Sequence, residues 1–237
     1  MAKYLYLFLD LASFLIPFLF SFERKWIHFI GRWKAILAGL GSMALFFLIW
    51  DVWFTGAGIW GFNDQYITGI KAYGLPLEEF LFFFLIGYSC LFIYESLHHL
   101  VPRPQWEKPA KTFFVIVALA NLLIAFLNTD KLYTLSAMAL NALGLILVLL
   151  MFKGFPWSKF LAGYAVSFIP FSLVNGVLTG GFTQEPVVWY NPAENLGIRL
   201  GTIPVEDSQY MMLMMLISTV VYEMVLKHNP LKFPVKS

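Results

Sequence analysis

Seven stretches of this chain are apolar enough and long enough to cross a lipid bilayer as helices. A span needs about 20 residues, because an α-helix rises about 1.5 Å per residue. Of the 237 residues, 59% are hydrophobic and 13% are charged, and a water-soluble chain of this length could not bury so much apolar surface in one core. We therefore expect an all-α polytopic membrane protein with seven transmembrane helices. The predicted spans cover roughly residues 4–22, 35–53, 76–97, 111–127, 133–152, 158–178 and 204–226.

The basic residues are unevenly divided between the two sides of these spans. Cytoplasmic loops of membrane proteins carry an excess of lysine and arginine. With the N-terminus outside, twelve basic residues fall on the cytoplasmic side and four on the outer side, which predicts an outer N-terminus and a cytoplasmic C-terminus. The twelve are Arg24, Lys25, Arg32, Lys34, Arg103, Lys108, Lys111, Lys153, Lys159, Lys227, Lys232 and Lys236, and the four are Lys3, Lys71, Lys131 and Arg199.

The chain also contains an internal repeat, which ends in a doubled acidic motif. Pro76-Leu77-Glu78-Glu79 is followed 128 residues later by Pro204-Val205-Glu206-Asp207. Self-similarity over this length indicates a duplicated structural unit. The offset of 128 also relates Asn63 to Asn191 and Tyr94-Glu95 to Tyr222-Glu223, and upstream an offset of 124 relates Asp51 to Asn175.

This duplication predicts how the helices are arranged. Helices 1–3 correspond to helices 5–7, and a three-helix unit ends on the side opposite to its start. The unpaired fourth helix returns the chain, so the two copies run parallel about a pseudo-two-fold axis along the membrane normal. Both acidic motifs then lie at the outer face. The expected organisation is a first repeat at residues 1–106, a linker helix at 107–130 and a second repeat at 131–237.

Each motif places two adjacent carboxylates in the first turn of a predicted helix. Proline suits the start of a helix, and the free N–H groups there favour a carboxylate, so one acid per motif could act only as a helix cap. Neighbouring residues on a helix point about 100° apart, so the second carboxylate can face the bundle interior. Ionisable groups in membrane helices are costly and commonly functional. Glu78, Glu79, Glu206 and Asp207 are therefore candidate catalytic residues.

Paired carboxyl groups in a poorly hydrated site suit proton-transfer chemistry, because one can act as an acid while the other acts as a base. Asp51, at the outer end of the second helix, lies at the same membrane level and is a fifth catalytic candidate. Its repeat partner Asn175 cannot titrate, so the two halves are chemically unequal. A purely structural alternative for Asp51 is an interfacial residue bonded to loop backbone.

Aromatic and amide residues surround both motifs. Aromatic faces can stabilise a cation by about 2 kcal/mol or more when desolvated. The alternative is a belt of aromatic side chains at the membrane interface. The candidate substrate-binding residues are Trp60, Phe62, Asn63, Asn175, Trp189, Tyr190 and Asn191.

The remaining polar and aromatic residues of the spans are given other roles. The phenylalanines at 80 and 82–84 are expected to face lipid or to pack, and Asp10 is a further candidate for the bundle interior. Glu95 and Glu223 lie roughly 25 Å along their helices from the motifs, which favours packing or ion pairing at the opposite face. No metal or cofactor site is predicted, because the histidines and the single Cys90 lack ligand spacing and no GxGxxG motif occurs.

The doubled motif, together with the loops before it, resembles the lycopene cyclase domain family. This small membrane type occurs as two separate subunits, as a fused tandem and within bifunctional fungal proteins, and the likeness is to the fused tandem over essentially the whole chain. The residues that carry it are Phe54-Thr55-Gly56, Ile59-Trp60-Gly61-Phe62-Asn63 and Pro76-Leu77-Glu78-Glu79-Phe80, repeated as Thr179-Gly180, Trp189-Tyr190-Asn191 and Ile203-Pro204-Val205-Glu206-Asp207.

The resemblance implies an intramolecular lyase or isomerase of carotenoid biosynthesis that needs no cofactor. Its substrate would be lycopene and its products would carry β-ionone rings, as in γ-carotene and β-carotene. An acid protonates the terminal double bond, the chain closes on the cation, and a base removes a ring proton. The essential residues implied are Glu78, Glu79, Glu206 and Asp207. The expected setting is a bacterial cell (inner) membrane, with the bilayer, other carotenoid enzymes or a second copy as partners, and no nucleic acid.

Two alternative functions are compatible with the sequence. A membrane carotenoid hydratase would begin with the same protonation and then add water to the end group. A seven-helix transporter or proton pathway would also use intramembrane carboxylates, although the acids here cluster at one face. A retinal-type photoreceptor is disfavoured, because the last span has no lysine before Lys227 at its cytoplasmic end.

The charge distribution predicts which loops can be labelled from which side of the membrane. In a Cys90→Ser background, single cysteines placed between residues 21 and 34 should react with a membrane-impermeant thiol reagent only from the cytoplasm. Cysteines placed between residues 61 and 74 should react only from outside. Labelling in the reverse pattern would refute the predicted orientation.

Overall fold

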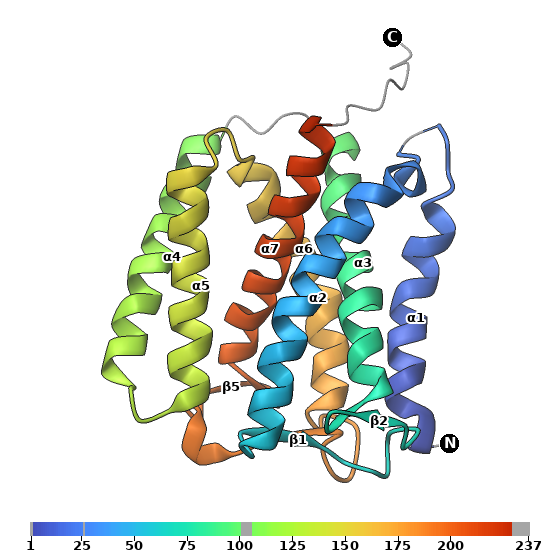
Figure 1. Ribbon diagram of the computed structural model, residues 1–237, viewed down its shortest axis with the longest axis vertical. Helices are drawn as coiled ribbons and strands as arrows, with labels where there is room; N and C mark the ends of the chain where they lie inside the picture. Colours follow the sequence, from blue (N-terminus) through green and yellow to red (C-terminus); the bar gives the residue numbers. More distant parts are fainter. Residues whose placement is uncertain (1, 26, 101–105, 229–237) are drawn as a thin grey trace.

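The computed structural model describes residues 2–25, 27–100 and 106–228, and within them the chain forms seven long α-helices (Figure 1). All seven are long and apolar enough to span a membrane, which confirms the predicted fold class. Three of the basic residues used to predict the orientation, Arg103, Lys232 and Lys236, lie outside the described residues. The helices are α1 (Leu5–Phe20), α2 (Trp33–Gly56), α3 (Leu77–Leu100), α4 (Glu107–Leu127), α5 (Leu132–Met151), α6 (Trp157–Leu178) and α7 (Glu206–His228), with short 3₁₀ turns at Ala2–Tyr4, Phe29–Arg32 and Pro192–Glu194.

The helices pack in pairs that the duplication relates to one another. Helix α1 packs against α3 as α5 packs against α7, and α2 packs against α7 as α6 packs against α3. The α2–α7 and α3–α6 contacts join the two repeats, so α3 and α7 lie at the centre of the bundle. Helix α4 packs mainly on α5 at one side and has no counterpart beside α1 (Figure 1). This is the arrangement expected for two parallel three-helix units with a linker helix.

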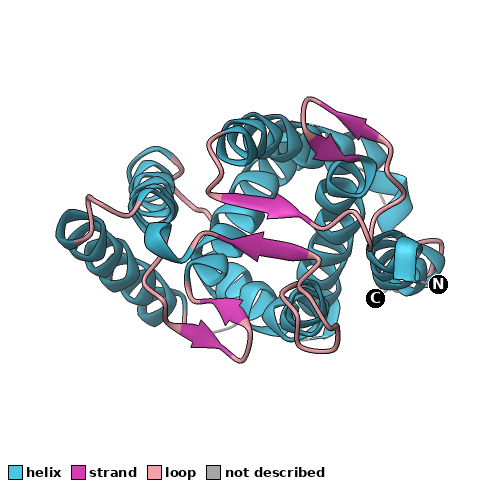
Figure 2. Ribbon diagram, turned by 90° about the horizontal axis from the view of Figure 1, so that it is seen from below, coloured by secondary structure: helices cyan, strands magenta, loops and turns pink. Residues whose placement is uncertain are grey.

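Six short strands gather at one end of the bundle, here called the strand end. Strand β1 (Trp60–Phe62) pairs antiparallel with β4 (Val188–Tyr190), and Gly61 lies opposite Trp189. Because these two residues are 128 positions apart, the pseudo-two-fold axis passes through the middle of this β1–β4 ribbon. Seen from this end, the ribbon lies between two hairpins on opposite sides (Figure 2). These are β2 (Lys71–Ala72) with β3 (Leu75–Pro76), and β5 (Arg199–Leu200) with β6 (Ile203–Pro204).

The hairpins bring each acidic motif to the start of a central helix. In the first hairpin, Tyr73 and Gly74 both have positive φ, as the tight two-residue turn of a hairpin requires. Pro76 ends β3 and α3 begins at the next residue, so the prolines lie just before their helices instead of in the first turn. Beyond each proline the backbone pairing continues, since the N–H of Leu77 donates to Ile70 at 2.8 Å and the N–H of Val205 donates to Ile198 at 3.0 Å.

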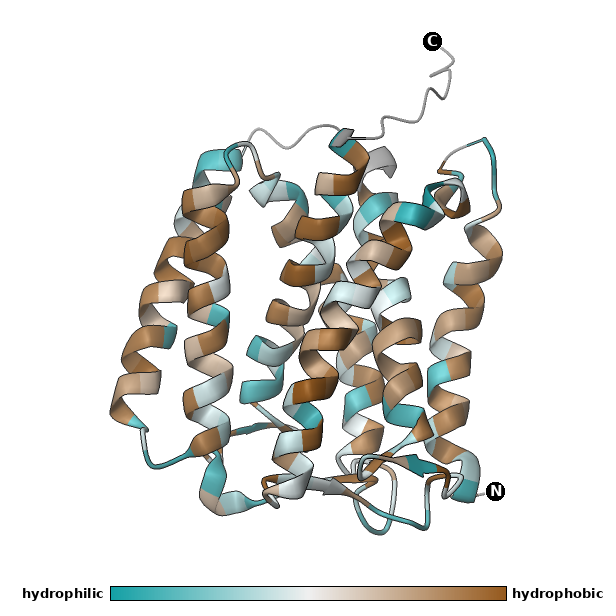
Figure 3. Ribbon diagram, viewed as in Figure 1, coloured by the Kyte–Doolittle hydropathy of each residue, from teal (hydrophilic) through white to brown (hydrophobic). Residues whose placement is uncertain are grey.

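The outer faces of the helices are apolar, as a lipid environment requires. Colouring by hydropathy shows hydrophobic residues along the length of the bundle and hydrophilic residues mainly at its two ends (Figure 3). Helix α1 is the most exposed of the spans. Large exposed hydrophobic side chains include Phe8, Ile16, Leu45, Ile49, Phe126, Leu150 and Leu173.

A network of ion pairs closes the end opposite to the strands. Lys159 Nζ lies 3.0 Å from a Glu95 oxygen and 3.2 Å from a Glu223 oxygen, and Arg32 is ion-paired with Glu95. The hydroxyl of Tyr94 donates a 2.6 Å hydrogen bond to Glu223. These contacts link the 3₁₀ turn before α2 with α3, α6 and α7, and they confirm the interpretation of Glu95 and Glu223 as ion-pair residues remote from the acidic motifs.

The α2–α7 contact generates a stability prediction. A Cβ atom at Gly39 would lie 2.6 Å from the backbone oxygen of Ser218 on α7, whereas a Cβ at Gly41 on the same helix would meet nothing within 4 Å. Gly39→Ala should therefore push α2 from α7 and cost roughly 1–3 kcal/mol. Gly41→Ala should leave stability unchanged or slightly raised. Thermal denaturation of the two detergent-solubilised variants measures the difference, and equal melting temperatures would contradict this packing.

Candidate active site

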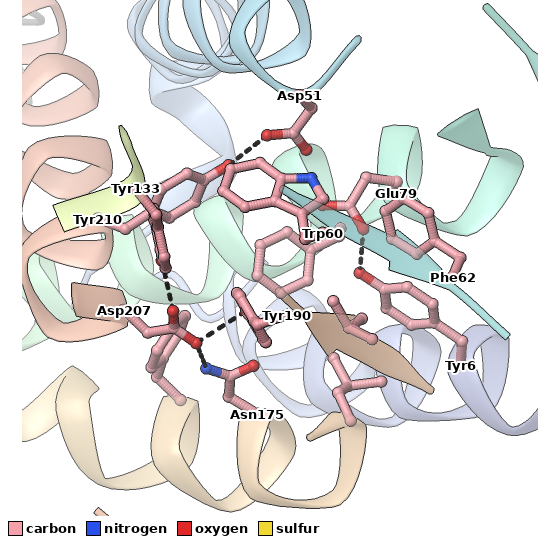
Figure 4. A pocket seen from close by; sticks show the side chains of 14 residues that line it. Tyr6, Asp51, Trp60, Phe62, Glu79, Tyr133, Asn175, Tyr190, Asp207 and Tyr210 are labelled. Carbon is pink, nitrogen blue, oxygen red and sulfur yellow. Dashed lines mark hydrogen bonds between the residues drawn. The ribbon is translucent and has the colours of Figure 1, made fainter. Parts of the chain in front are cut away.

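A small cavity lies at the strand end, where the two repeats meet. Its volume is about 50 Å³, and side chains from α1, α2, α3, α5, α6, α7 and the β1–β4 ribbon surround it (Figure 4). Both repeats thus contribute to one cavity on the pseudo-two-fold axis. The lining residues are Tyr6, Asp51, Trp60, Phe62, Glu79, Phe82, Tyr133, Phe171, Asn175, Leu178, Val188, Tyr190, Asp207 and Tyr210.

In the first repeat, two carboxyl groups meet at the cavity wall. Glu79 accepts a 2.6 Å hydrogen bond from the hydroxyl of Tyr6, and Asp51 accepts one of 2.8 Å from Tyr210. The carboxyl groups of Asp51 and Glu79 both line the cavity and are close enough to interact with each other. Both acids are almost completely buried. The structure therefore brings together two of the predicted catalytic residues from α2 and α3.

In the second repeat, Asp207 is the carboxyl group in the cavity. It accepts hydrogen bonds from the hydroxyl of Tyr133, from the Asn175 amide at 2.6 Å and from the Tyr190 hydroxyl at 3.0 Å (Figure 4). Burial, together with the negative charge of Asp207, raises the pKa of Tyr190 well above its ordinary value. The Tyr190 hydroxyl consequently stays protonated and remains a donor to Asp207.

The two groups of contacts are related by the repeat, but they are chemically different. Glu79 corresponds to Asp207 at an offset of 128, and Tyr6 to Tyr133 at 127. Asp51 in the first repeat takes the place of Asn175 in the second, so a carboxyl faces Glu79 where an amide faces Asp207. Two of the aromatic positions also differ. The pairs at an offset of 128 are Phe62 with Tyr190 and Phe82 with Tyr210.

The other carboxylate of each motif holds the preceding loop. Glu78 accepts a 2.6 Å hydrogen bond from the backbone N–H of Thr68. Glu206 accepts one of 2.7 Å from the backbone N–H of Leu196 and another of 2.6 Å from the hydroxyl of Thr134. Neither Glu78 nor Glu206 lines the cavity, although both are fully buried. Each motif thus has one acid bonded to a loop and one acid facing the cavity.

Trp60 is the centre of an aromatic cluster around the cavity. Its ring lies 5.2 Å from that of Tyr133, 6.0 Å from that of Tyr210 and 6.2 Å from that of Tyr190, measured between centroids. Tyr133 and Tyr190 are stacked at 5.6 Å. Phe62 and Val188 add apolar surface from the ribbon. A positive charge formed in this cavity would lie among aromatic rings and carboxyl groups in a site with little water.

Some residues predicted from the sequence lie outside the cavity. The side chains of Asn63 and Asn191 accept hydrogen bonds from the backbone N–H groups of Gln65 and Ala193, which fixes turns beside the ribbon. Trp189 is 41% exposed, and its ring covers Gly61, where a Cβ atom would come within 2.4 Å of it. Asp10 is fully buried and does not line the cavity. Its carboxyl oxygens have no hydrogen-bond partner among the residues that the structure describes.

Comparison with known proteins agrees with the geometry. A family model described as lycopene cyclase matches residues 3–97 and 130–225, which together make up more than half of the chain. The chain belongs to the lycopene cyclase family. The two matched segments begin 127 residues apart and end 128 residues apart, which agrees with the repeat, and they exclude α4.

One fungal relative shares part of this lycopene cyclase sequence. The bifunctional lycopene cyclase/phytoene synthase of Phycomyces blakesleeanus is 30% identical to the chain over 111 residues. That match covers 44% of the chain and 18% of the relative, so it corresponds to less than a fifth of the fungal protein. No solved structure matches the chain. Within residues 2–25, 27–100 and 106–228, no group of three His, Cys, Asp or Glu side chains could hold a metal ion.

Seven residues that line the cavity were not among the candidates selected from the sequence, namely Tyr6, Phe82, Tyr133, Phe171, Leu178, Val188 and Tyr210. Tyr6 and Tyr133 occupy the first helix of each repeat, and extending the repeat comparison upstream would have found them. Tyr210 follows Asp207 by three residues, so the two share a helix face, but its repeat partner Phe82 offers no matching signal. Phe82 was expected to face lipid or to pack, and it is buried and packed, but it also lines the cavity.

The loop contacts predict separate effects for two substitutions at Glu78. Glu78→Ala leaves the Thr68 N–H without its acceptor, which should cost about 1.5–3 kcal/mol of local stability. Glu78→Gln keeps an acceptor oxygen and should change little. Hydrogen exchange at Thr68 measures the effect and should rise in the alanine variant only. Unchanged exchange at Thr68 in Glu78→Ala would show that this hydrogen bond does not hold the loop.

Proposed function

We propose that this protein cyclises the acyclic end groups of lycopene to β-ionone rings by acid–base catalysis. The products would be γ-carotene after one ring and β-carotene after two. The proposed reaction is an isomerisation within the substrate, and it needs no cofactor. Family membership supports the substrate class, and the carboxyl groups in the cavity support the chemistry.

The observation that carries this proposal is the meeting of Glu79, Asp51 and Asp207 in one aromatic cavity. Isolated carboxyl groups are costly in a membrane helix, so three of them around one cavity indicate a functional site. Cyclisation requires a proton donor and a proton acceptor at the same end group. Glu79 and Asp207, at equivalent positions of the two repeats, each place a carboxyl group in the cavity, and one could donate a proton while the other accepts one.

The proposed steps use the contacts described above. A protonated carboxyl transfers its proton to the terminal double bond, and the cation that forms lies near the rings of Trp60 and Tyr190. The chain closes on this cation to form the six-membered ring. A second carboxylate then removes a ring proton. Because the charge develops among aromatic rings and buried carboxylates, the site stabilises it more than water would.

Substrate entry requires the apolar wall of the cavity to move. A space of about 50 Å³ has room for only a few water molecules, whereas ligand cavities are usually about 300–1,000 Å³. Phe82, Phe171 and Leu178 form the wall contributed by α3 and α6. Lycopene dissolves in the bilayer, so we propose that an end group enters from lipid by displacing these side chains.

The proposed enzyme works in a bacterial cell membrane, with both repeats in one polypeptide. The strand end, and with it the cavity, would face outward across a bacterial cell membrane. Residues 1–106 and 131–237 would form the two cyclase repeats, joined by the linker at 107–130. Other carotenoid enzymes or a second copy of the chain would be the protein partners.

The proposal predicts different effects on activity for the two acids of each motif, because only one of them lines the cavity. Glu79→Gln and Asp207→Asn should each lower ring formation by at least about 100-fold, because a general acid or base typically contributes about 10²–10⁴-fold. The matched changes Glu78→Gln and Glu206→Gln should leave most of the activity, because glutamine still accepts the loop hydrogen bonds. The sequence alone made all four acids catalytic candidates, and the geometry favours the two that line the cavity.

The measurement is pigment extraction from cells that make lycopene and express each variant at equal levels in the membrane. Wild-type protein should convert lycopene to cyclic isomers of unchanged mass. Products heavier by one water would indicate a hydratase. Accumulation of unchanged lycopene with the wild-type protein, or full activity of Glu79→Gln and Asp207→Asn, would refute the proposal.

A further inference from the structure

We infer that the two halves of the cavity have fixed, opposite roles, with the Asp51–Glu79 pair delivering the proton and Asp207 receiving it. This inference rests on the proposed cyclase function and goes beyond it, because it assigns a direction to proton transfer. It further assigns Tyr210 and Asn175 as positioning residues, one for each half. The reasons lie in the hydrogen-bond donors that each carboxyl group receives.

The contact between Asp51 and Glu79 requires a proton. An ionised carboxylate can only accept hydrogen bonds. Tyr210 already donates to Asp51, and Tyr6 already donates to Glu79. Neither hydroxyl can also supply a hydrogen between the two carboxyl groups, so a hydrogen bond between them requires a proton on one of the carboxyls. Two buried carboxyl groups in contact commonly share one proton in this way, because both cannot ionise side by side.

Asp207 has no such requirement. Asn175 stands where Asp51 stands in the other repeat, and its amide donates a 2.6 Å hydrogen bond. Tyr133 and Tyr190 donate two more. All three donors are neutral groups that stabilise an ionised carboxylate. Asp207 is therefore a carboxylate ready to accept a proton, and the exchange of aspartate for asparagine between the repeats separates the acid from the base.

The reaction balances with these roles. The O–H bond of the pair breaks as a C–H bond forms at the terminal double bond, which leaves a cation on the neighbouring carbon. The next double bond attacks this cation, forming the ring C–C bond and moving the charge to the ring carbon that bears a methyl group. Asp207 then takes a proton from an adjacent carbon, and the electrons of that C–H bond form the ring double bond. The return of this proton to the pair restores the resting enzyme.

The position of the base decides which ring isomer forms. The cationic ring carbon has three neighbours that carry hydrogen, namely the ring carbon that bears the polyene, the ring methylene and the methyl group. Loss of a proton from them gives the β, ε and γ ring, respectively. A displaced base should therefore change the ring type, whereas a weakened acid should only reduce the amount of product.

The test compares variants of the two halves in lycopene-producing cells, with total cyclic product and ring-isomer composition as separate readouts. Asp51→Asn should lower total conversion by at least about 100-fold, and the residual product should keep the wild-type ring type. Tyr210→Phe removes only the hydroxyl that orients Asp51, and it should lower conversion less, again without a change in ring type. Asn175→Ala and Tyr190→Phe remove donors to Asp207 and should raise the share of ε and γ rings.

A double exchange provides the matched control. Asp51→Asn with Asn175→Asp keeps the composition and charge of the cavity but places the carboxyl pair in the second repeat. Activity should recover relative to Asp51→Asn, with a ring-isomer composition unlike that of the wild type. The inference is overturned if Asp51→Asn and Asn175→Ala give the same ring composition, or if the double exchange is no more active than Asp51→Asn. Those outcomes leave the proposed function standing, because ring formation by the wild-type protein and its loss in Glu79→Gln and Asp207→Asn test that function separately.

Discussion

The pairing of β1 with β4 ties the two repeats together at the end of the bundle where the carboxyl groups meet. Backbone hydrogen bonds continue beyond the ribbon in matched pairs, since the N–H of Asn63 donates to Val187 and the N–H of Asn191 donates to Ile59, both at 2.8 Å. At a membrane interface such groups must be paired within the protein or with water. The ribbon therefore fixes Trp60 and Tyr190 beside the axis and, through the hairpins, the start of each central helix.

The fold was largely predictable because lipid makes helix formation almost obligatory for an apolar segment. The predicted spans agree with the observed helices to within a few residues, except that α4 begins at Glu107 instead of Lys111. The duplication was visible because its acidic motifs are locally conspicuous. The six strands were not predicted, since each has only two or three residues and forms through pairing that no local periodicity records.

The acidic motifs of the candidate site could be found in the sequence, but the role of each residue within them could not. The sequence indicated that one acid of each motif could cap its helix while the other faced inward, but it could not say which, and it did not predict that the first acid would bond to the preceding loop. Which of Glu78 and Glu79 reaches the cavity depends on the rotation of α3 against α1 and α2, a tertiary contact. Tyr210 reaches Asp51 across the repeat boundary, so no spacing in the sequence links them.

The centre of the ribbon has a consequence for assembly from separate pieces. Gly61 and Trp189 face each other on the pseudo-two-fold axis, where the indole fills the space left by the missing side chain. If two identical second halves paired, two tryptophan rings would clash in a space that fits only one. If two identical first halves paired, two glycines would face each other and the space would stay unfilled. If the repeats were made as independent polypeptides, the ribbon would select an unlike partner over a like one. The same steric asymmetry would ensure that every assembled molecule contains one half with Asp51 and one half with Asn175.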